Sequence, residues 1–156
     1  MKPVTVRPAC PDDLPAIVEM GKSLHAARQT HAPFCAHTLA ELVAEIAQDD
    51  TLGCVLVAEC DHDIIGMAAA CRVLTWYNRA VPIAQELFWW VAPRARGSLA
   101  AKRLMQGMED WAQHTGCTRF VMTIIPDGTC ARVKRWHARR GYKPLDVLIH
   151  KELQHG

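Results

Sequence analysis

The segment Val91–Lys102 carries the clearest chemical signal in the sequence. It joins an apolar run to a helical pattern through a short turn that contains Gly97. A turn of this kind exposes backbone N–H groups beside the positive end of a helix, and the two together make an anion site. The side chains of Arg96 and of Lys102 or Arg103 would add positive charge for phosphate groups. The alternative is a plain strand–turn–helix connection in which Ser98 caps the helix.

A buried strand must precede this turn. Leu87–Val91 is an unbroken row of bulky apolar residues, which indicates a central strand with both faces covered. Glu86 directly precedes the row and is the only acidic residue between Asp63 and Glu109. From the residues alone, Glu86 is either a functional carboxylate or a polar residue at the start of the strand.

Hydrophobic spacing and turn residues predict the remaining elements. Helices are expected over 14–28, 38–49, 98–114 and 131–140, and strands over 4–7, 54–59, 64–73, 82–91, 120–125 and once or twice within 142–152. Thr38 and Glu41 have the spacing of a capping box at the second helix. No repeat or linker divides the chain. We therefore expect one domain over residues 1–156, with the order β-α-α-β-β-β-α-β-α-β and helices on the faces of a mixed sheet.

The composition is that of an ordinary globular protein. The chain has 156 residues, 50% hydrophobic and 22% charged, with a formal net charge of +2. This balance gives no electrostatic indication of a nucleic-acid or membrane-surface protein. The seven cysteines are odd in number and include no C-x-x-C pair, so most are expected to be small core residues. No leader or membrane-spanning run is evident, and we expect a cytoplasmic protein.

Two side-chain clusters suggest further chemistry. His31, Cys35 and His37 are metal-ligand types, but no fourth ligand or zinc-like pair is evident, so no metal site is expected. Six cations gather near the C-terminal helix: Arg132, Lys134, Arg135, Arg139, Arg140 and Lys143. A solvated helix face is the favoured interpretation, and a contact for RNA, DNA or an acidic substrate is the alternative.

The turn also matches a family pattern. Val91-x-Pro93 is followed by Arg96-Gly97-Ser98-Leu99-Ala100-Ala101. This resembles the V-x-P strand end and the [RQ]-x-x-G-x-[GA] helix start of the GNAT superfamily of acyl-CoA-dependent N-acetyltransferases, with Leu99 in place of the central glycine. Residues 4–13, 57–66 and 139–142 resemble other family elements in the same order.

The resemblance implies an α/β fold of the α+β type: a mixed, mostly antiparallel central sheet, splayed between two parallel strands, with helices on both faces. The splayed strands are those that end at Val91 and contain Phe120–Ile125. Acetyl-CoA is the implied co-substrate, with pantetheine in the gap. The backbone of Trp89, Trp90 and Val91 would bind pantetheine and polarise the thioester. The implied pyrophosphate-binding residues are Arg96, Gly97, Ser98, Leu99, Ala100, Ala101 and Lys102.

The resemblance also implies catalytic roles. A protonated amine has no lone pair for attack, and the family commonly places a basic carboxylate on the central strand, where this chain has Glu86. His137 occupies the position of the family's proton-donating Tyr, and Cys130 that of an upstream Asn in the cofactor site. An imidazole can donate a proton; the alternative is a histidine packed on a helix face. Tyr142 is the second candidate donor.

The sequence therefore predicts an N-acetyltransferase that moves an acetyl group from acetyl-CoA to a primary amine by direct attack in a ternary complex. The acceptor would be a small molecule or peptide, selected by residues 25–37 and by Trp76 and Tyr77; a homodimer is left open. One alternative is a non-catalytic acyl-CoA-binding module, which the departures at Leu99, Cys130 and His137 keep open. The other is an acyltransferase that modifies tRNA or a DNA base, which only the basic helix favours.

Overall fold

The computed structural model describes residues 3–28, 32–124 and 130–145. Internal contacts divide the chain into two compact units, Met1–Thr123 and Ile124–Gly156, and each unit is described by itself below. The single domain over residues 1–156 stays a prediction. Within the described ranges, no helix is long and apolar enough to cross a membrane.

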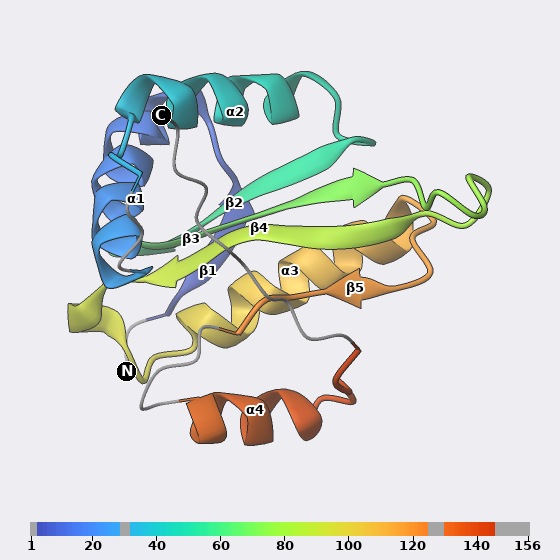
Figure 1. Cartoon of the computed structure of the whole chain (residues 1–156). Helices are drawn as coiled ribbons and strands as arrows, with labels where there is room; N and C mark the ends of the chain where they lie inside the picture. The colour runs from blue at the N-terminus through green and yellow to red at the C-terminus, as the bar shows by residue number, and fades with distance from the viewer. Residues whose placement is uncertain (1–2, 29–31, 125–129, 146–156) are drawn as a thin grey trace, which may run out of the picture. The chain divides into compact units, whose positions relative to one another are not determined.

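A five-stranded sheet is the centre of the first unit (Figure 1). Its strands, in spatial and chain order, are β1 (Thr5–Pro8), β2 (Gly53–Cys60), β3 (Asp63–Val73), β4 (Ile83–Val91) and β5 (Phe120–Val121). Neighbours pair antiparallel, except that β4 and β5 are parallel. Asp61 and His62 close the β2–β3 hairpin with φ of 53° and 66°, the conformation of a two-residue type I′ turn.

Helices cover both faces of this sheet. Helices α1 (Leu14–Arg28) and α2 (Ala36–Gln48) share one apolar cluster with the sheet, and α3 (Ala100–His114) shares the other. The side chains of β2 alternate between the two clusters, because successive residues of a strand point to opposite faces. Val55 and Val57 lie in the first cluster, and Leu56 and Ala58 lie in the second. The predicted fold class is confirmed.

Strand β4 contains a bulge at Leu87. Ala69 pairs with Phe88 and Ala70 pairs with Glu86, so Leu87 has no partner in β3. The extra residue interrupts the alternation, and Leu87 and Phe88 both pack toward the cluster of α1 and α2. A bulge bends its strand and changes the direction of neighbouring side chains, in this case those on either side of Leu87.

Two predicted helix starts are wrong. Helix α2 begins at Ala36 with Cys35 as its N-cap, so Thr38 lies in the first turn instead of capping it. Tertiary packing overrides the local capping pattern here: the Leu39 side chain lies so close to Gly21 of α1 that a Cβ on Gly21 would overlap it. Helix α3 begins at Ala100 with Leu99 as N-cap.

Two strand predictions also need correction. The strand expected over 120–125 pairs with β4 only at Phe120 and Val121, because the chain leaves β4 beyond that point. Residues 142–145 form no strand, and the remainder of the stretch predicted over 142–152 lies outside the described residues. The basic helix is confirmed as α4 (Cys130–Ala138) in the second unit.

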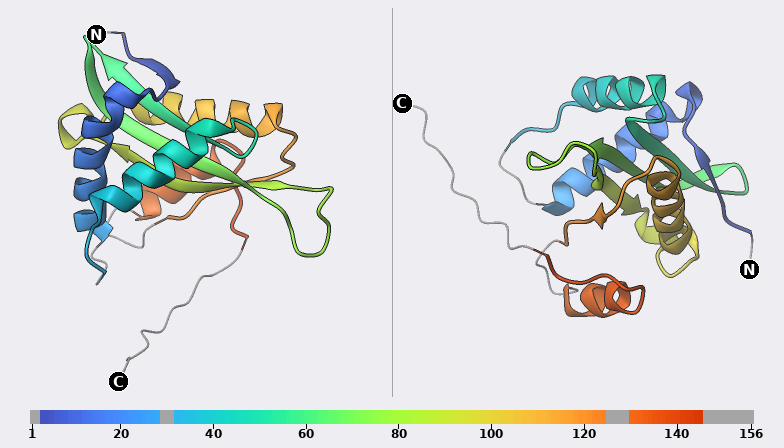
Figure 2. Two further views of the ribbon diagram at one scale, coloured as in Figure 1. Left: turned by 90° about the horizontal axis from the view of Figure 1, so that it is seen from above. Right: turned by 90° about the vertical axis from the view of Figure 1, so that its right-hand side faces the viewer.

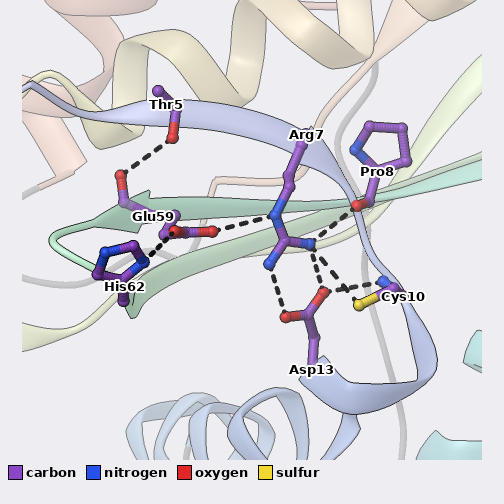
Figure 3. A network of polar contacts seen from close by, with 7 residues as sticks. All are labelled: Thr5, Arg7, Pro8, Cys10, Asp13, Glu59 and His62. Atoms are coloured by element: carbon purple, nitrogen blue, oxygen red, sulfur yellow. Dashed lines mark hydrogen bonds and ion pairs between the residues drawn. The ribbon is translucent and has the colours of Figure 1, made fainter.

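An ion-pair network joins β1, β2 and the short 3₁₀ helix Pro11–Asp13 (Figure 3). The Arg7 guanidinium donates two hydrogen bonds to the Asp13 carboxylate, at 2.6 and 2.9 Å, and one to Glu59 at 3.0 Å. Asp13 is buried and also accepts the Cys10 backbone N–H at 2.8 Å. Hydrogen bonding to Arg7 lowers the pKa of Asp13 from 3.8 to about 2.

We expect Asp13→Asn to lower the free energy of unfolding by about 1–2 kcal/mol at pH 7. Because the pKa of Asp13 is depressed in the folded state, its contribution is complete above about pH 4 and is lost as the pH falls toward 2. Urea unfolding at pH 7 and pH 3 should therefore show a smaller difference from the wild type at pH 3. Asp12→Asn, at an exposed neighbour, is the matched control, and an equal effect from both variants would contradict the prediction.

Candidate active site

The turn between β4 and α3 has the geometry of an anion site. Gly97 has a φ of +88°, and no atom lies within 4 Å of the place where its Cβ would stand. The chain therefore needs glycine there for its conformation, and the space above this backbone is open. Ser98 Oγ accepts the Ala100 N–H at 3.2 Å, while Ala101 and Lys102 belong to the first turn, whose N–H groups have no intrahelical acceptor.

Leu99 does not obstruct this turn. Its φ of −75° and ψ of −5° are helical, so the position does not require the glycine that the family pattern has there. The side chain is 41% exposed. The departure from the pattern therefore leaves the backbone conformation of the turn intact.

Arg96 adds a positive charge beside the turn. Its guanidinium lies over the Trp90 ring, 4.8 Å from the ring centroid, a distance typical of a cation–π contact. The Arg96 side chain is exposed, so its N–H donors remain accessible while the aromatic ring restrains its position. Trp90, near the end of β4, thus holds the Arg96 cation beside the turn that is the candidate anion site.

Strands β4 and β5 separate next to this turn. Their pairing consists of Ala84 with Phe120 and Gln85 with Val121. Farther along β4, the Ala92 N–H bonds to Ile65 of β3. Since backbone direction alternates along an antiparallel pair, the N–H and C=O groups of Trp89 and Val91 point to the opposite side, where β5 has diverged. Of the three predicted residues, Trp89 and Val91 therefore direct their backbone groups toward this side, and Trp90 directs its own toward β3.

Glu86 lies where the two strands separate. Its side chain is only 4% exposed, and it stands directly before the bulge at Leu87. Its Oε2 accepts the Thr123 backbone N–H at 3.3 Å, so the carboxylate takes the place of a strand partner. The Arg28 guanidinium lies 3.9 Å from Oε1. Burial raises the pKa of Glu86, against the opposing effects of the Thr123 N–H and Arg28.

The sequence of this region matches a family model. The model of the acetyltransferase (GNAT) family matches residues 22–142, a range that includes the β4–α3 turn and Glu86. The chain belongs to the GNAT family. It has no match among curated protein sequences.

Solved structures share the GNAT fold over almost the whole chain. Glucosamine-6-phosphate N-acetyltransferase from Arabidopsis thaliana is 13% identical, with a TM-score of 0.77, and the match covers 98% of this chain and 100% of that one. AAC(6′)-Iy in complex with a bisubstrate analogue is 23% identical, with a TM-score of 0.76 and coverage of 97% and 99%. A predicted acetyltransferase with acetyl-CoA from Clostridium acetobutylicum is 15% identical, with a TM-score of 0.76 and coverage of 96% of each chain.

The other two predicted site residues belong to the second unit, and their roles stay predictions. Cys130 is the half-buried first residue of α4. His137 is buried, and its Nδ1 lies 2.9 Å from the Val133 carbonyl oxygen. The rings of Trp136 and Tyr142 lie edge-on to His137, with centroids at 5.0 and 5.3 Å. The imidazole is thus held by its own helix and by two aromatic rings.

The predicted acceptor residues include an exposed aromatic pair. The connection between β3 and β4 projects beyond the end of the sheet (Figure 2), and it carries Trp76 and Tyr77, whose rings meet edge-on at 5.5 Å. In the 25–37 stretch, His25 Nε2 lies 2.7 Å from the Ala32 carbonyl oxygen. Of the proposed metal-ligand types, His31 lies outside the described residues, and His37 pairs with Glu41 at 3.1 Å.

The exposure of the cations of α4 and of the residues after it is compatible both with a solvated face and with a nucleic-acid contact. Five of the six side chains are exposed, namely Arg132, Lys134, Arg135, Arg139 and Lys143. Arg140 is half-buried, and its guanidinium lies 5.5 Å from the centroid of the Trp136 ring.

Sequence reasoning missed two partners of Glu86. Arg28 stands in the last turn of α1, where a cation is ordinarily explained by the helix dipole. Thr123 acts through its backbone N–H, which no side-chain pattern reveals. Only the fold brings these two residues to Glu86.

Proposed function

We propose that this GNAT protein transfers an acetyl group from acetyl-CoA to a primary amine by direct attack in a ternary complex. The observation that carries the proposal is the position of Glu86. It is a buried carboxylate with a raised pKa, on the strand that leads into an anion-binding turn. The reaction requires a general base and a binding site for the phosphates of the co-substrate.

The residues of the turn fit the co-substrate. The pyrophosphate would lie over Gly97, where the backbone is open, and would accept hydrogen bonds from the N–H groups of the first α3 turn, with Arg96 as counter-charge. Pantetheine would extend along β4, on the side where β5 has diverged, and bond to the backbone of Trp89 and Val91. One of the GNAT neighbours was crystallised with acetyl-CoA, which supports this choice of co-substrate.

Acetyl-CoA supplies the activated acyl group as a thioester, and the chain moves the protons. Glu86 accepts one proton from the bound ammonium, and the neutral amine that results attacks the thioester carbonyl. A backbone N–H of β4 stabilises negative charge on the thioester oxygen. The C–N bond forms and the C–S bond breaks, the nitrogen loses its second proton to solvent, and the departing thiolate takes a proton. We assign that proton to His137.

The test begins with the co-substrate. Acetyl-CoA at a hundred times its Kd should stabilise the protein by about 2.7 kcal/mol, measured as a rise in Tm, and CoA release should then require a primary amine. Arg96→Ala should weaken acetyl-CoA binding about tenfold, because a charge-assisted bond to phosphate is lost. Arg94→Ala is the matched control, since Arg94 is an exposed neighbour that lies 3.8 Å from Asp63.

Each other outcome identifies a different function. No shift in Tm with any acyl-CoA would contradict the proposal. Binding of acetyl-CoA without product from a broad panel of amines would indicate a non-catalytic acyl-CoA-binding module. Product formed only on tRNA or DNA would indicate a nucleic-acid acyltransferase.

A further inference from the structure

Arg28 forms an ion pair with the buried Glu86 carboxylate and is itself more exposed to solvent. The side chain of Arg28 is 36% exposed, whereas that of Glu86 is 4% exposed. One Arg28 nitrogen lies 3.9 Å from Glu86 Oε1, which is too far for a hydrogen bond but close enough for strong electrostatic interaction. A guanidinium at this place is part of the environment that an incoming amine meets.

The hydrogen-bonding capacity of Arg28 is not used by the described part of the chain, where it has the Glu86 ion pair and no hydrogen-bond acceptor. A guanidinium presents five N–H donors in a planar fork that matches the two oxygens of a carboxylate or phosphate. The donors that do not face Glu86 are therefore available to an oxyanion on a bound molecule.

A cation beside Glu86 would discriminate among amines by charge. An acceptor reaches Glu86 as an ammonium, and the guanidinium 3.9 Å from the carboxylate would repel it. A polycation increases this repulsion with every further charge. An acceptor that carries its own oxyanion beside the amine reverses the effect, because the ammonium meets Glu86 while the oxyanion meets Arg28. Since the two protein atoms are 3.9 Å apart, the two ligand groups must be separated by only a few bonds.

We propose that Arg28 forms an oxyanion subsite for the acceptor, which is a primary amine with a carboxylate or phosphate a few bonds from its nitrogen. This inference rests on the proposed acetyltransferase function and names its substrate class. It excludes polycationic aminoglycosides as preferred acceptors, although a GNAT neighbour was crystallised with an aminoglycoside. Arg28 is thus a specificity residue, and Glu86 remains the base.

The test compares matched amines that differ in the oxyanion. Phenylalanine is paired with phenylalaninamide, and phosphoethanolamine with ethanolamine, so that the carboxylate and phosphate sources are separated; neamine is the polycation. The wild type should prefer the anionic member of at least one pair by tenfold or more in kcat/KM. Arg28→Gln should abolish that preference, mainly by raising KM for the anionic amine, and Arg28→Lys should restore part of it.

Lys22→Gln is the matched control. It removes the same charge from the same helix, at an exposed side chain that pairs with Glu19 at 2.6 Å, and it should leave the preference intact. Affinity for acetyl-CoA should be equal in all variants. A preference that is absent in the wild type, or unchanged in Arg28→Gln, would overturn the inference and leave the acetyltransferase function standing.

Failure of the proposed acetyltransferase function would appear as a lack of CoA release with every amine. If none of the amines releases CoA, binding of the same pairs to the protein–CoA complex is measured by calorimetry. A preference for the anionic member that Arg28→Gln abolishes supports the oxyanion subsite, and equal binding of both members overturns it.

Discussion

Glu86→Gln is expected to lower kcat by about 10²–10⁴-fold, the usual contribution of a general base, with acetyl-CoA affinity unchanged. Glutamine keeps the shape of the side chain and an oxygen that can accept the Thr123 N–H, which the carboxylate accepts at 3.3 Å. It has no basic oxygen for the amine proton. Steady-state kinetics and acetyl-CoA titration of the same preparation measure the two effects separately.

The pH dependence follows from the burial of Glu86, which raises its pKa above the ordinary 4.5. The carboxylate must be ionised to act as a base, so kcat/KM should fall as the pH drops through this raised pKa. The acid limb of the wild-type profile should therefore lie above pH 4.5, and Glu86→Gln should lack that limb. A limb that persists in the variant would assign the titration to another group.

Stability provides the second readout. For a carboxyl group whose pKa is raised in the folded state, stability is greatest below the unfolded pKa and decreases as the pH rises through the folded pKa. Ionisation of Glu86 therefore costs stability, and Glu86→Gln should have an equal or higher Tm. Glu45→Gln, at an exposed position of α2, is the control for charge removal. A variant with low activity and a low Tm would indicate a structural role for Glu86 instead.

The sequence was most informative where one element determines its own environment. The apolar row after Glu86 predicted a central strand, and β4 lies between β3 and β5. A short turn containing Gly97 was predicted between a strand and a helix, and in that turn Gly97 has a φ of +88°, a conformation that glycine adopts readily. In both places the local chemistry leaves few alternatives, so local reasoning predicts the structure.

The sequence was less informative where distant residues meet. The β5 strand is shorter than predicted, and just beyond its end the Thr123 N–H bonds to the Glu86 side chain of β4, a contact that no pattern in residues 120–125 reveals. Arg28 looks like an ordinary helix-terminal cation until the fold brings it beside Glu86. The prediction of Thr38 as a helix cap was wrong because it considered only local residues. In the structure α2 begins earlier, and Leu39 packs on Gly21 of α1. Electrostatics of the site thus depend on contacts that only the tertiary structure creates.

The position of the β4–α3 turn depends on how α3 packs against the sheet, and Leu104 is central to that packing. Its side chain is 0% exposed. It packs onto Gly66 of β3, where a Cβ would lie 3.0 Å from Leu104 Cδ1. A helix this close to the sheet leaves little room for rearrangement after a side chain is shortened.

Leu104→Ala is therefore expected to lower the free energy of unfolding by about 2–5 kcal/mol, the range for a buried leucine that leaves a cavity. Leu52→Ala removes the same atoms at a side chain that is 56% exposed and should change it by less than about 0.5 kcal/mol. Urea unfolding without acetyl-CoA measures both. In conditions where Leu104→Ala stays folded, acetyl-CoA binding should also weaken, because Leu104 lies about one turn after the N–H groups that we propose bind the pyrophosphate. A loss below 1 kcal/mol, or equal losses in the two variants, would show that α3 is positioned by other contacts.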